Sequence, residues 1–127
     1  MEKSVRLSRV LGQINAPASK SFMLRAIAAA ILSDDKLEIK NPTFCDDAEA
    51  ALKIAENFGF DVIRDKKSVK IKKKNDATTY SLNCGESGLA IRMFAPIAAL
   101  LDTEVELKGE GSLKTRPMSM IEEPLKQ

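Results

Sequence analysis

The sequence predicts a mixed α/β fold (α+β) built from one repeated unit of the form strand–helix–strand–helix–strand–strand. Short segments with the period-two alternation of strands are interspersed with longer segments that have helical spacing. The same order of elements begins twice, and the second copy stops before its closing hairpin. A chain of 127 residues, of which 44% are hydrophobic and 30% charged, is long enough for one buried core.

The first half of the chain shows two helices among short strands. Strands are expected at residues 13–16, 36–40, 60–64 and 68–72, and residues 4–10 also alternate polar and apolar side chains. Ser19 can cap a helix over residues 19–32, which is rich in Ala, Leu, Met and Ile. An amphipathic helix over residues 46–58 precedes Gly59, a residue type that often terminates helices. The last two strands form a hairpin that turns at residues 65–67.

The second half passes through the same elements again. Strands are expected at residues 80–83 and 104–108, on either side of a strongly apolar helix over residues 87–101. A final helix over residues 117–126 starts with proline, which is tolerated in a first turn. The helix over residues 87–101 and the earlier helix over residues 19–32 are nearly apolar all round. Because only burial on most sides explains this, we expect the two to pack side by side beneath the sheet.

Two pairs of matching segments indicate an internal repeat. Each apolar helix contains a single arginine, Arg25 or Arg92, four residues after a small residue. The strand segment LEIKN at residues 37–41 has a counterpart, VELKG, at residues 105–109, at nearly the same separation. A fixed separation with the same element order suggests a duplicated unit. The alternative is two ordinary strand–helix–strand units.

The repeat divides the chain into a first unit, residues 1–75, and a truncated second unit, residues 76–127. Residues 1–16 are expected to pack with a lobe that lies outside this chain. Because repeat units bury their faces on their neighbours, we expect the chain to be a fragment of a longer protein. Apolar helix surface left uncovered by a missing third unit would favour self-association.

The composition excludes several classes of protein. Without histidine the chain cannot use Ser-His-Asp or Cys-His catalysis, and two cysteines cannot form a four-cysteine zinc site. Its 20 Lys and Arg against 18 Asp and Glu give a net charge of +2, a smaller excess than nucleic-acid binders usually show. No apolar stretch approaches the roughly 18 residues of a membrane helix, and the N-terminus lacks an apolar signal core. We therefore expect a cytoplasmic protein with reduced cysteines that binds neither nucleic acid nor a membrane.

Three segments that precede helices are candidates for anion binding. Lys20, Ser21 and Arg25 can converge at the start of the first helix, where free N–H groups and the helix dipole favour negative charge. Gly88 follows a glycine-containing turn at the start of the second apolar helix, and Arg116 ends a flexible loop before the last helix. The structural alternatives are a snorkelling arginine, a tight turn with a helix cap, and an exposed loop residue.

Taken together, the three segments resemble those of the enolpyruvylshikimate-phosphate synthase (3-phosphoshikimate 1-carboxyvinyltransferase) family. PASKSFMLRAI at residues 17–27 is similar to the family signature P-G-S-K-S-x-x-x-R-A-L. CGESGLAIRMF at residues 84–94 is similar to the segment N-x-G-T-x-x-R, and LKGEGSLKTRPM at residues 107–118 to the loop L-x-G-x-x-x-L-x-x-R-P. The resemblance runs from about Val10 to Pro124 and implies a fold of two lobes, each with three copies of the repeated unit.

The resemblance also implies a function and roles for individual residues. The family transfers the enolpyruvyl group of phosphoenolpyruvate to shikimate 3-phosphate in the shikimate pathway of aromatic amino acid biosynthesis, without metal or cofactor. Lys20, Ser21 and Arg25 would bind shikimate 3-phosphate, and Lys20 would also contact phosphoenolpyruvate. Gly88, through its N–H, and Arg116 would bind phosphoenolpyruvate. The catalytic acids and bases of the family lie in the other lobe, so they are unknown here.

The chain departs from the family pattern at three positions. Ala18 replaces a glycine, Leu89 replaces a threonine, and Glu86 replaces an asparagine that contacts phosphoenolpyruvate. A carboxylate beside an anionic substrate is unfavourable unless it turns away or is protonated. Two alternatives remain beside the synthase. One is the sibling transferase acting on UDP-N-acetylglucosamine, which has Lys-Asn where this chain has Lys20-Ser21. It also has a reactive cysteine in the loop before its Arg-Pro, whereas that loop here holds Ser112 and no cysteine. The other is a non-catalytic anion-binding module of the same fold.

Overall fold

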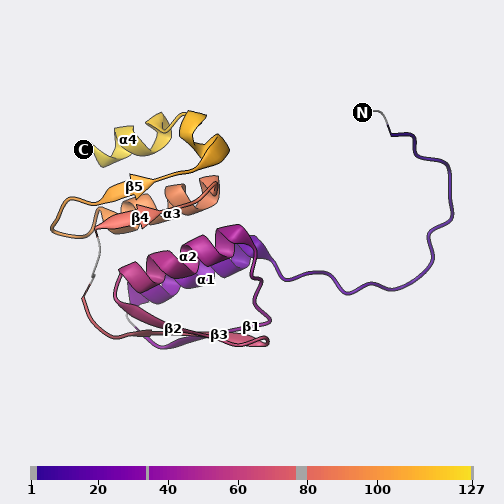
Figure 1. Cartoon of the computed structure of the whole chain (residues 1–127), viewed down its shortest axis with the longest axis horizontal. Coiled ribbons are helices and arrows are strands. Elements are labelled where there is room, and N and C mark those ends of the chain that lie inside the picture. Colours follow the sequence, from indigo (N-terminus) through magenta and orange to yellow (C-terminus); the bar gives the residue numbers. More distant parts are fainter. Residues whose placement is uncertain (1–2, 34, 77–79, 127) are drawn as a thin grey trace.

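The chain forms stacked layers of helices and strands, from which residues 3–19 extend as an arm (Figure 1). The computed structural model describes residues 3–33, 35–76 and 80–126. In chain order the elements are α1 (Lys20–Ser33), β1 (Leu37–Lys40), α2 (Asp46–Asn57), β2 (Phe60–Arg64), β3 (Ser68–Lys73), β4 (Ser81–Asn83), α3 (Gly88–Ala98), β5 (Glu106–Lys108), the 3-10 helix η1 (Gly111–Thr115) and α4 (Ser119–Leu125).

The described strands form two separate sheets. β1, β3 and β2 make an antiparallel sheet in that order, and the hairpin between β2 and β3 is closed by a 2.8 Å hydrogen bond from Asp65 N–H to Ser68 C=O. β4 and β5 pair in parallel. Gly59, at φ +86°, lets the chain reverse between α2 and β2, because its missing side chain leaves room for the carbonyl of Asn75.

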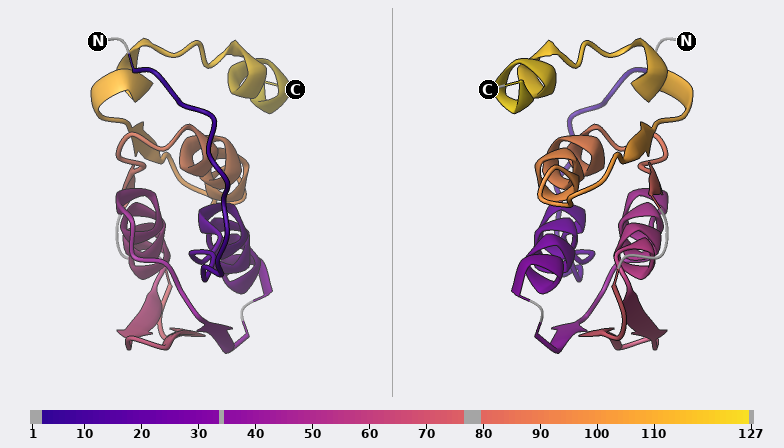
Figure 2. Two further views of the ribbon diagram at one scale, coloured as in Figure 1. Left: turned by 90° about the vertical axis from the view of Figure 1, so that its right-hand side faces the viewer. Right: turned by 90° about the vertical axis from the view of Figure 1, so that its left-hand side faces the viewer.

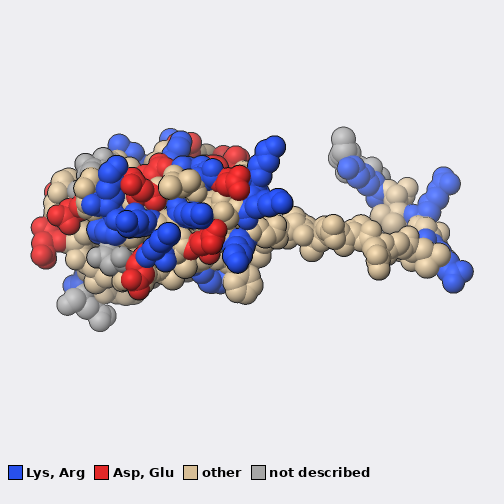
Figure 3. Space-filling view, turned by 90° about the horizontal axis from the view of Figure 1, so that it is seen from below, with Lys and Arg blue, Asp and Glu red and all other residues tan. Residues whose placement is uncertain are grey.

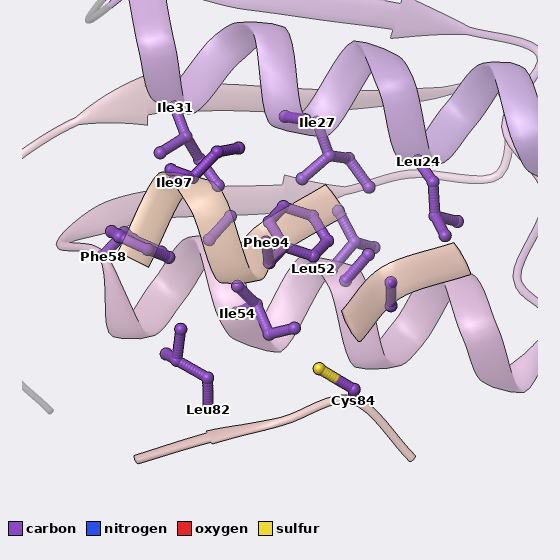
Figure 4. Packing of buried hydrophobic residues seen from close by; sticks show 14 of the residues in the cluster. Leu24, Ile27, Ile31, Leu52, Ile54, Phe58, Leu82, Cys84, Phe94 and Ile97 are labelled. Atoms are coloured by element: carbon purple, nitrogen blue, oxygen red, sulfur yellow. The ribbon is translucent and has the colours of Figure 1, made fainter. Parts of the chain in front are cut away.

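The core lies between the layers rather than under one sheet. α1 and α2 cover one face of the three-stranded sheet, and α3 with β4 and β5 forms the next layer above them (Figure 2). Phe94 of α3 points into this space among Ile27 of α1 and Leu52 of α2 (Figure 4), and all three side chains are fully buried. The expectation that α1 and α3 pack against each other is confirmed. α3 nevertheless lies on the far side of α1 and α2 from the three-stranded sheet, because its own strand partners are β4 and β5.

The expected strand at residues 13–16 is not formed, and this prediction is wrong for the described structure. Residues 3–19 contain no strand, and residues 4–10 are likewise extended and exposed. The arm carries large apolar side chains that face solvent: Val5, Leu7, Val10, Leu11 and Ile14. An alternating pattern reports a segment suited to a sheet face, but a strand forms only where a neighbour accepts its backbone hydrogen bonds. The described residues offer this arm no such neighbour.

Other elements match the expectations apart from their ends. β2 spans the expected residues, whereas α3 and β5 are shorter than the expected residues 87–101 and 104–108. Ser19 and Ser87 act as caps, since Phe22 N–H donates to Ser19 Oγ at 3.4 Å and Ala90 N–H to Ser87 Oγ at 3.2 Å. η1 lies in a segment expected to be a loop. Residues 77–79, at the expected start of the second unit, lie outside the described residues.

The lysine-rich β2–β3 hairpin has a mixed charge pattern on its outer face. Figure 3 views the molecule from the side of this sheet and shows acidic side chains interspersed among the basic ones. Lys74 Nζ lies 3.1 Å from Asp61 Oδ1, and Lys70 Nζ lies 4.0 Å from Glu38 Oε1. These pairs are typical of a solvated sheet face.

The two cysteines are free and differ in burial. Cys84 is fully buried and Cys45 is half-buried, and burial raises the pKa of the Cys84 thiol from 9.0 to about 11. A raised pKa in the folded state means that the unfolded chain loses this proton first as pH rises. We expect the free energy of unfolding to be unaffected by Cys84 below pH 9, and to fall by about 2 to 3 kcal/mol as pH rises from 9 to 11.

Denaturant unfolding of the wild type and of Cys84→Ala across this pH range checks the expectation. Cys84→Ala removes the thiol and should flatten this part of the pH dependence, whereas Cys45→Ala, the matched control, should keep it. The same slope in the wild type and in Cys84→Ala would contradict the assignment.

Candidate functional site

The N-termini of α1, α2 and α3 meet at one end of the layers, next to η1 (Figure 1). Lys20, the first residue of α1, places Nζ 2.7 Å from Oδ2 of Asp47 in α2. Ser87, the cap of α3, donates its hydroxyl to the same Asp47 oxygen at 3.0 Å. Asp47 therefore joins the starts of three helices, and the group Lys20, Asp47, Ser87, Gly88 and Arg116 is called here the helix-end cluster.

The charges of the cluster are mutually stabilised. The hydrogen bond from Lys20 holds the pKa of Asp47 below its usual value, helped by the Ser87 hydroxyl and the charge of Arg116 and opposed by partial burial. The hydrogen bond to Asp47 in turn raises the pKa of Lys20. The Lys20 side chain is 50% exposed and that of Asp47 only 22%. An ammonium group has three donors, so Lys20 can give one to Asp47 and still offer others to an anion from solvent.

Arg116 lies against the start of α3. It follows η1, and its Nη2 donates to Ser112 Oγ at 3.3 Å. A Cβ atom on Gly88 would lie 2.6 Å from Nη1 of Arg116, so the absence of a side chain allows the guanidinium to approach the helix. The first helical hydrogen bond of α3 is donated by Ile91 to the Ser87 carbonyl, so the N–H of Gly88 precedes the hydrogen-bonded turn. The guanidinium of Arg116 thus lies beside the start of α3, and its charge acts on Asp47, the partner of Lys20.

The remaining candidates lie apart from these contacts. Ser21 is half-buried and Arg25 is exposed on α1, and neither side chain has a hydrogen bond or ion pair with the residues that the structure describes. Their place in one anion site with Lys20 therefore stays a prediction. Arg92, the arginine of the second apolar helix, lines a small cavity between α3 and α4 together with Met120 and Ile121.

Asp47 is the cluster residue that the sequence analysis missed. An acidic residue in the first turn of a helix is already explained by the helix dipole. Nothing in the local sequence therefore indicated its contact with Lys20. A topological signal was available, because helices that follow successive strands of such units begin at the same end of the layers. An acidic residue at one such start faces the basic residue at another.

Within residues 3–33, 35–76 and 80–126, no group of three or more Cys, Asp and Glu residues is placed to hold a metal ion. The helices of this described part are also too short or too polar to span a membrane.

The fold and the cluster together define an α/β protein with charged residues gathered at the starts of three helices, and comparison with known proteins identifies its family. The model of the EPSP synthase (3-phosphoshikimate 1-carboxyvinyltransferase) family matches residues 5–127, and the chain belongs to this family. The match leaves only the first four residues outside.

Individual relatives agree with the family match. The chain is 30% identical over 123 residues to the 3-phosphoshikimate 1-carboxyvinyltransferase of Methanobrevibacter smithii, covering 94% of this chain and 28% of the relative. It is 34% identical to the 3-phosphoshikimate 1-carboxyvinyltransferase of Methanosarcina mazei, and the match covers 98% of this chain and 30% of the relative. The structure of EPSP synthase from Acinetobacter baumannii superimposes with a TM-score of 0.73 at 24% identity, over 91% of this chain and 27% of that one, and supports the fold. The chain thus spans somewhat under a third of the length of these relatives.

Proposed function

We propose that this chain is the part of a 3-phosphoshikimate 1-carboxyvinyltransferase that holds the anionic groups of its two substrates. The observation that carries the proposal is the helix-end cluster, in which Lys20 pairs with Asp47 and the charge of Arg116, lying against Gly88, acts on the same carboxylate. Helix N-termini and cations together favour phosphate and carboxylate groups. The reaction would transfer the enolpyruvyl group of phosphoenolpyruvate to shikimate 3-phosphate and release inorganic phosphate.

The roles of the residues follow from charge and position. Lys20 would contact both substrates, because its side chain is half-exposed while Asp47 fixes the direction of its ammonium group. Arg116 and the N–H of Gly88 would bind phosphoenolpyruvate, since the guanidinium lies directly against the start of α3. Ser21 and Arg25 would bind shikimate 3-phosphate from the adjoining turns of α1. Asp47 would act as a positioning residue that keeps Lys20 charged and aimed at the site.

The proposal places catalysis of proton transfer outside this chain. Addition and elimination require a proton to reach the methylene carbon of phosphoenolpyruvate and another to leave the attacking hydroxyl. Glu86 and Glu110, the carboxylates of the neighbouring loops, accept hydrogen bonds from Ser112 N–H and from the Asn83 side chain. Asp47 is paired with Lys20. The chain can therefore position anions, whereas the acid and base would come from the rest of the enzyme.

The 127-residue chain is accordingly expected to bind shikimate 3-phosphate without turning it over. Phosphate release from both substrates should not exceed the rate without protein, while a calorimetric titration with shikimate 3-phosphate should show saturable binding. Binding without turnover fits an incomplete site that water can enter. Turnover near that of an intact synthase would contradict the assignment of the missing acid and base, and failure to bind either substrate would contradict the proposed function.

The proposed function also has consequences for the compartment, the cofactor and the association state of the protein. We propose that it works in the cytoplasm on small anions, without a cofactor. Exposed apolar side chains such as Phe22 and Leu100 support the further proposal that the chain by itself associates with other copies. Sedimentation velocity at increasing concentration tests this, and a constant monomer would contradict it.

A further inference from the structure

Two loops beside the helix-end cluster are joined to each other by hydrogen bonds. One is the turn before α3, residues 84–87, and the other is the segment that leads into η1, residues 109–112. The backbone N–H of Glu110 donates to the Gly85 carbonyl at 2.7 Å, and the Asn83 side chain donates to Glu110 Oε1, also at 2.7 Å. The second loop, which leads to Arg116, is therefore held against the first one.

Glu86 contacts Ser112, the residue that also bonds to Arg116. Its Oε2 accepts a hydrogen bond from the backbone N–H of Ser112 at 3.2 Å. The hydroxyl of the same Ser112 accepts a hydrogen bond from Nη2 of Arg116 at 3.3 Å. Ser112 thus links the two residues, since Glu86 bonds to its backbone and Arg116 bonds to its side chain.

Gly111 makes this contact sterically feasible. The carboxylate of Glu86 occupies the space in which a side chain on Gly111 would begin, and Gly111 has φ +45°, in the left-handed region that favours glycine. The carboxylate is therefore directed at the loop that leads into η1. This orientation gives the carboxylate a hydrogen-bond partner in the backbone, while its negative charge stays close to the helix-end cluster.

We propose that Glu86 is a positioning residue, whose carboxylate holds the start of η1 so that Arg116 lies against Gly88 and can receive phosphoenolpyruvate. The inference rests on the proposed function of Arg116. The competing interpretation is that Glu86 is only a nearby negative charge that weakens anion binding. The two interpretations predict opposite effects when the charge is removed, which makes them separable.

The experiment compares Glu86→Ala and Glu86→Gln with the wild type, using Glu104→Ala as a control that removes the same charge from an exposed position with no described partner. Two NMR readouts are recorded on the 127-residue chain. The first, without ligand, is hydrogen exchange of the Ser112 amide and relaxation of Arg116 Nε–H. The second is the dissociation constant for phosphoenolpyruvate, followed at the Gly88 amide.

Glu86→Ala should speed exchange of the Ser112 amide and loosen Arg116, and should weaken phosphoenolpyruvate binding about fivefold, the loss expected for one hydrogen bond. Glu86→Gln keeps an acceptor oxygen without the charge and should stay within about twofold of the wild type. Tighter binding in both variants, with unchanged Ser112 and Arg116 signals, would overturn the inference. If the wild type binds no phosphoenolpyruvate but the first readout responds as expected, Glu86 still positions Arg116 and the proposed substrate is wrong.

Discussion

Charge reversal at Lys20, Lys20→Glu, is expected to weaken the binding of shikimate 3-phosphate by at least about 50-fold. The substitution removes the cation that Asp47 orients at 2.7 Å and places a second carboxylate beside it. Two adjacent negative charges repel an anionic ligand as well as each other. Calorimetric titration of both chains with shikimate 3-phosphate measures the effect.

The control has to change the same charge away from the cluster. Lys36→Glu serves this purpose, because Lys36 is exposed just before β1, beyond the C-terminal end of α1. It should leave binding within about twofold, the change expected from a screened, distant charge. Lys20→Met tests the loss of the cation without the added repulsion and should also bind weakly. Unchanged affinity in Lys20→Glu would remove Lys20 from the site.

Truncation of the central core side chain, Phe94→Ala, is expected to lower the free energy of unfolding by about 3 to 5 kcal/mol. Phe94 is fully buried where α3 packs on α1 and α2, so its removal leaves a cavity between two layers (Figure 4). A loss of this size is a large part of the stability of a domain, commonly about 5 to 15 kcal/mol. Denaturant unfolding measures it.

A matched substitution at an exposed phenylalanine separates the loss of packing in Phe94→Ala from the effect of alanine on helix propensity. Phe22→Ala makes the same replacement within α1, where the residue is 75% exposed, and should cost less than about 1 kcal/mol. Equal losses for the two variants would show that α3 does not depend on Phe94 for its attachment to the first two helices.

Local patterns predicted those elements whose partners lie close in the sequence. β2 and β3 form a hairpin across a three-residue turn, so alternation and turn residues suffice to define them. The caps Ser19 and Ser87 were likewise predictable, because a cap bonds within its own first turn. The arm at residues 3–19 was not, because the same alternation that defines β3 requires a neighbouring strand, and none adjoins it among the described residues.

The candidate site shows the same division between local and distant information. Lys20, Gly88 and Arg116 could be selected from their places before helices and from the family motifs. The contact of Lys20 with Asp47 joins residues from two different helices, and no spacing within either helix encodes it. From the sequence, Glu86 is a carboxylate unfavourably placed beside an anionic ligand. Its hydrogen bond to Ser112 could not be predicted, because that bond depends on how the two loops fold against each other.

The most direct test of the central claim is to map, by NMR of the isotopically labelled wild-type chain, the amides that respond to shikimate 3-phosphate and to phosphoenolpyruvate. The account predicts that the changes concentrate at the starts of α1 and α3, at Lys20, Ser21 and Gly88, and at Arg116. A lack of response at these positions, or changes that follow the lysines of the β2–β3 hairpin instead, would contradict an anion site at the helix-end cluster.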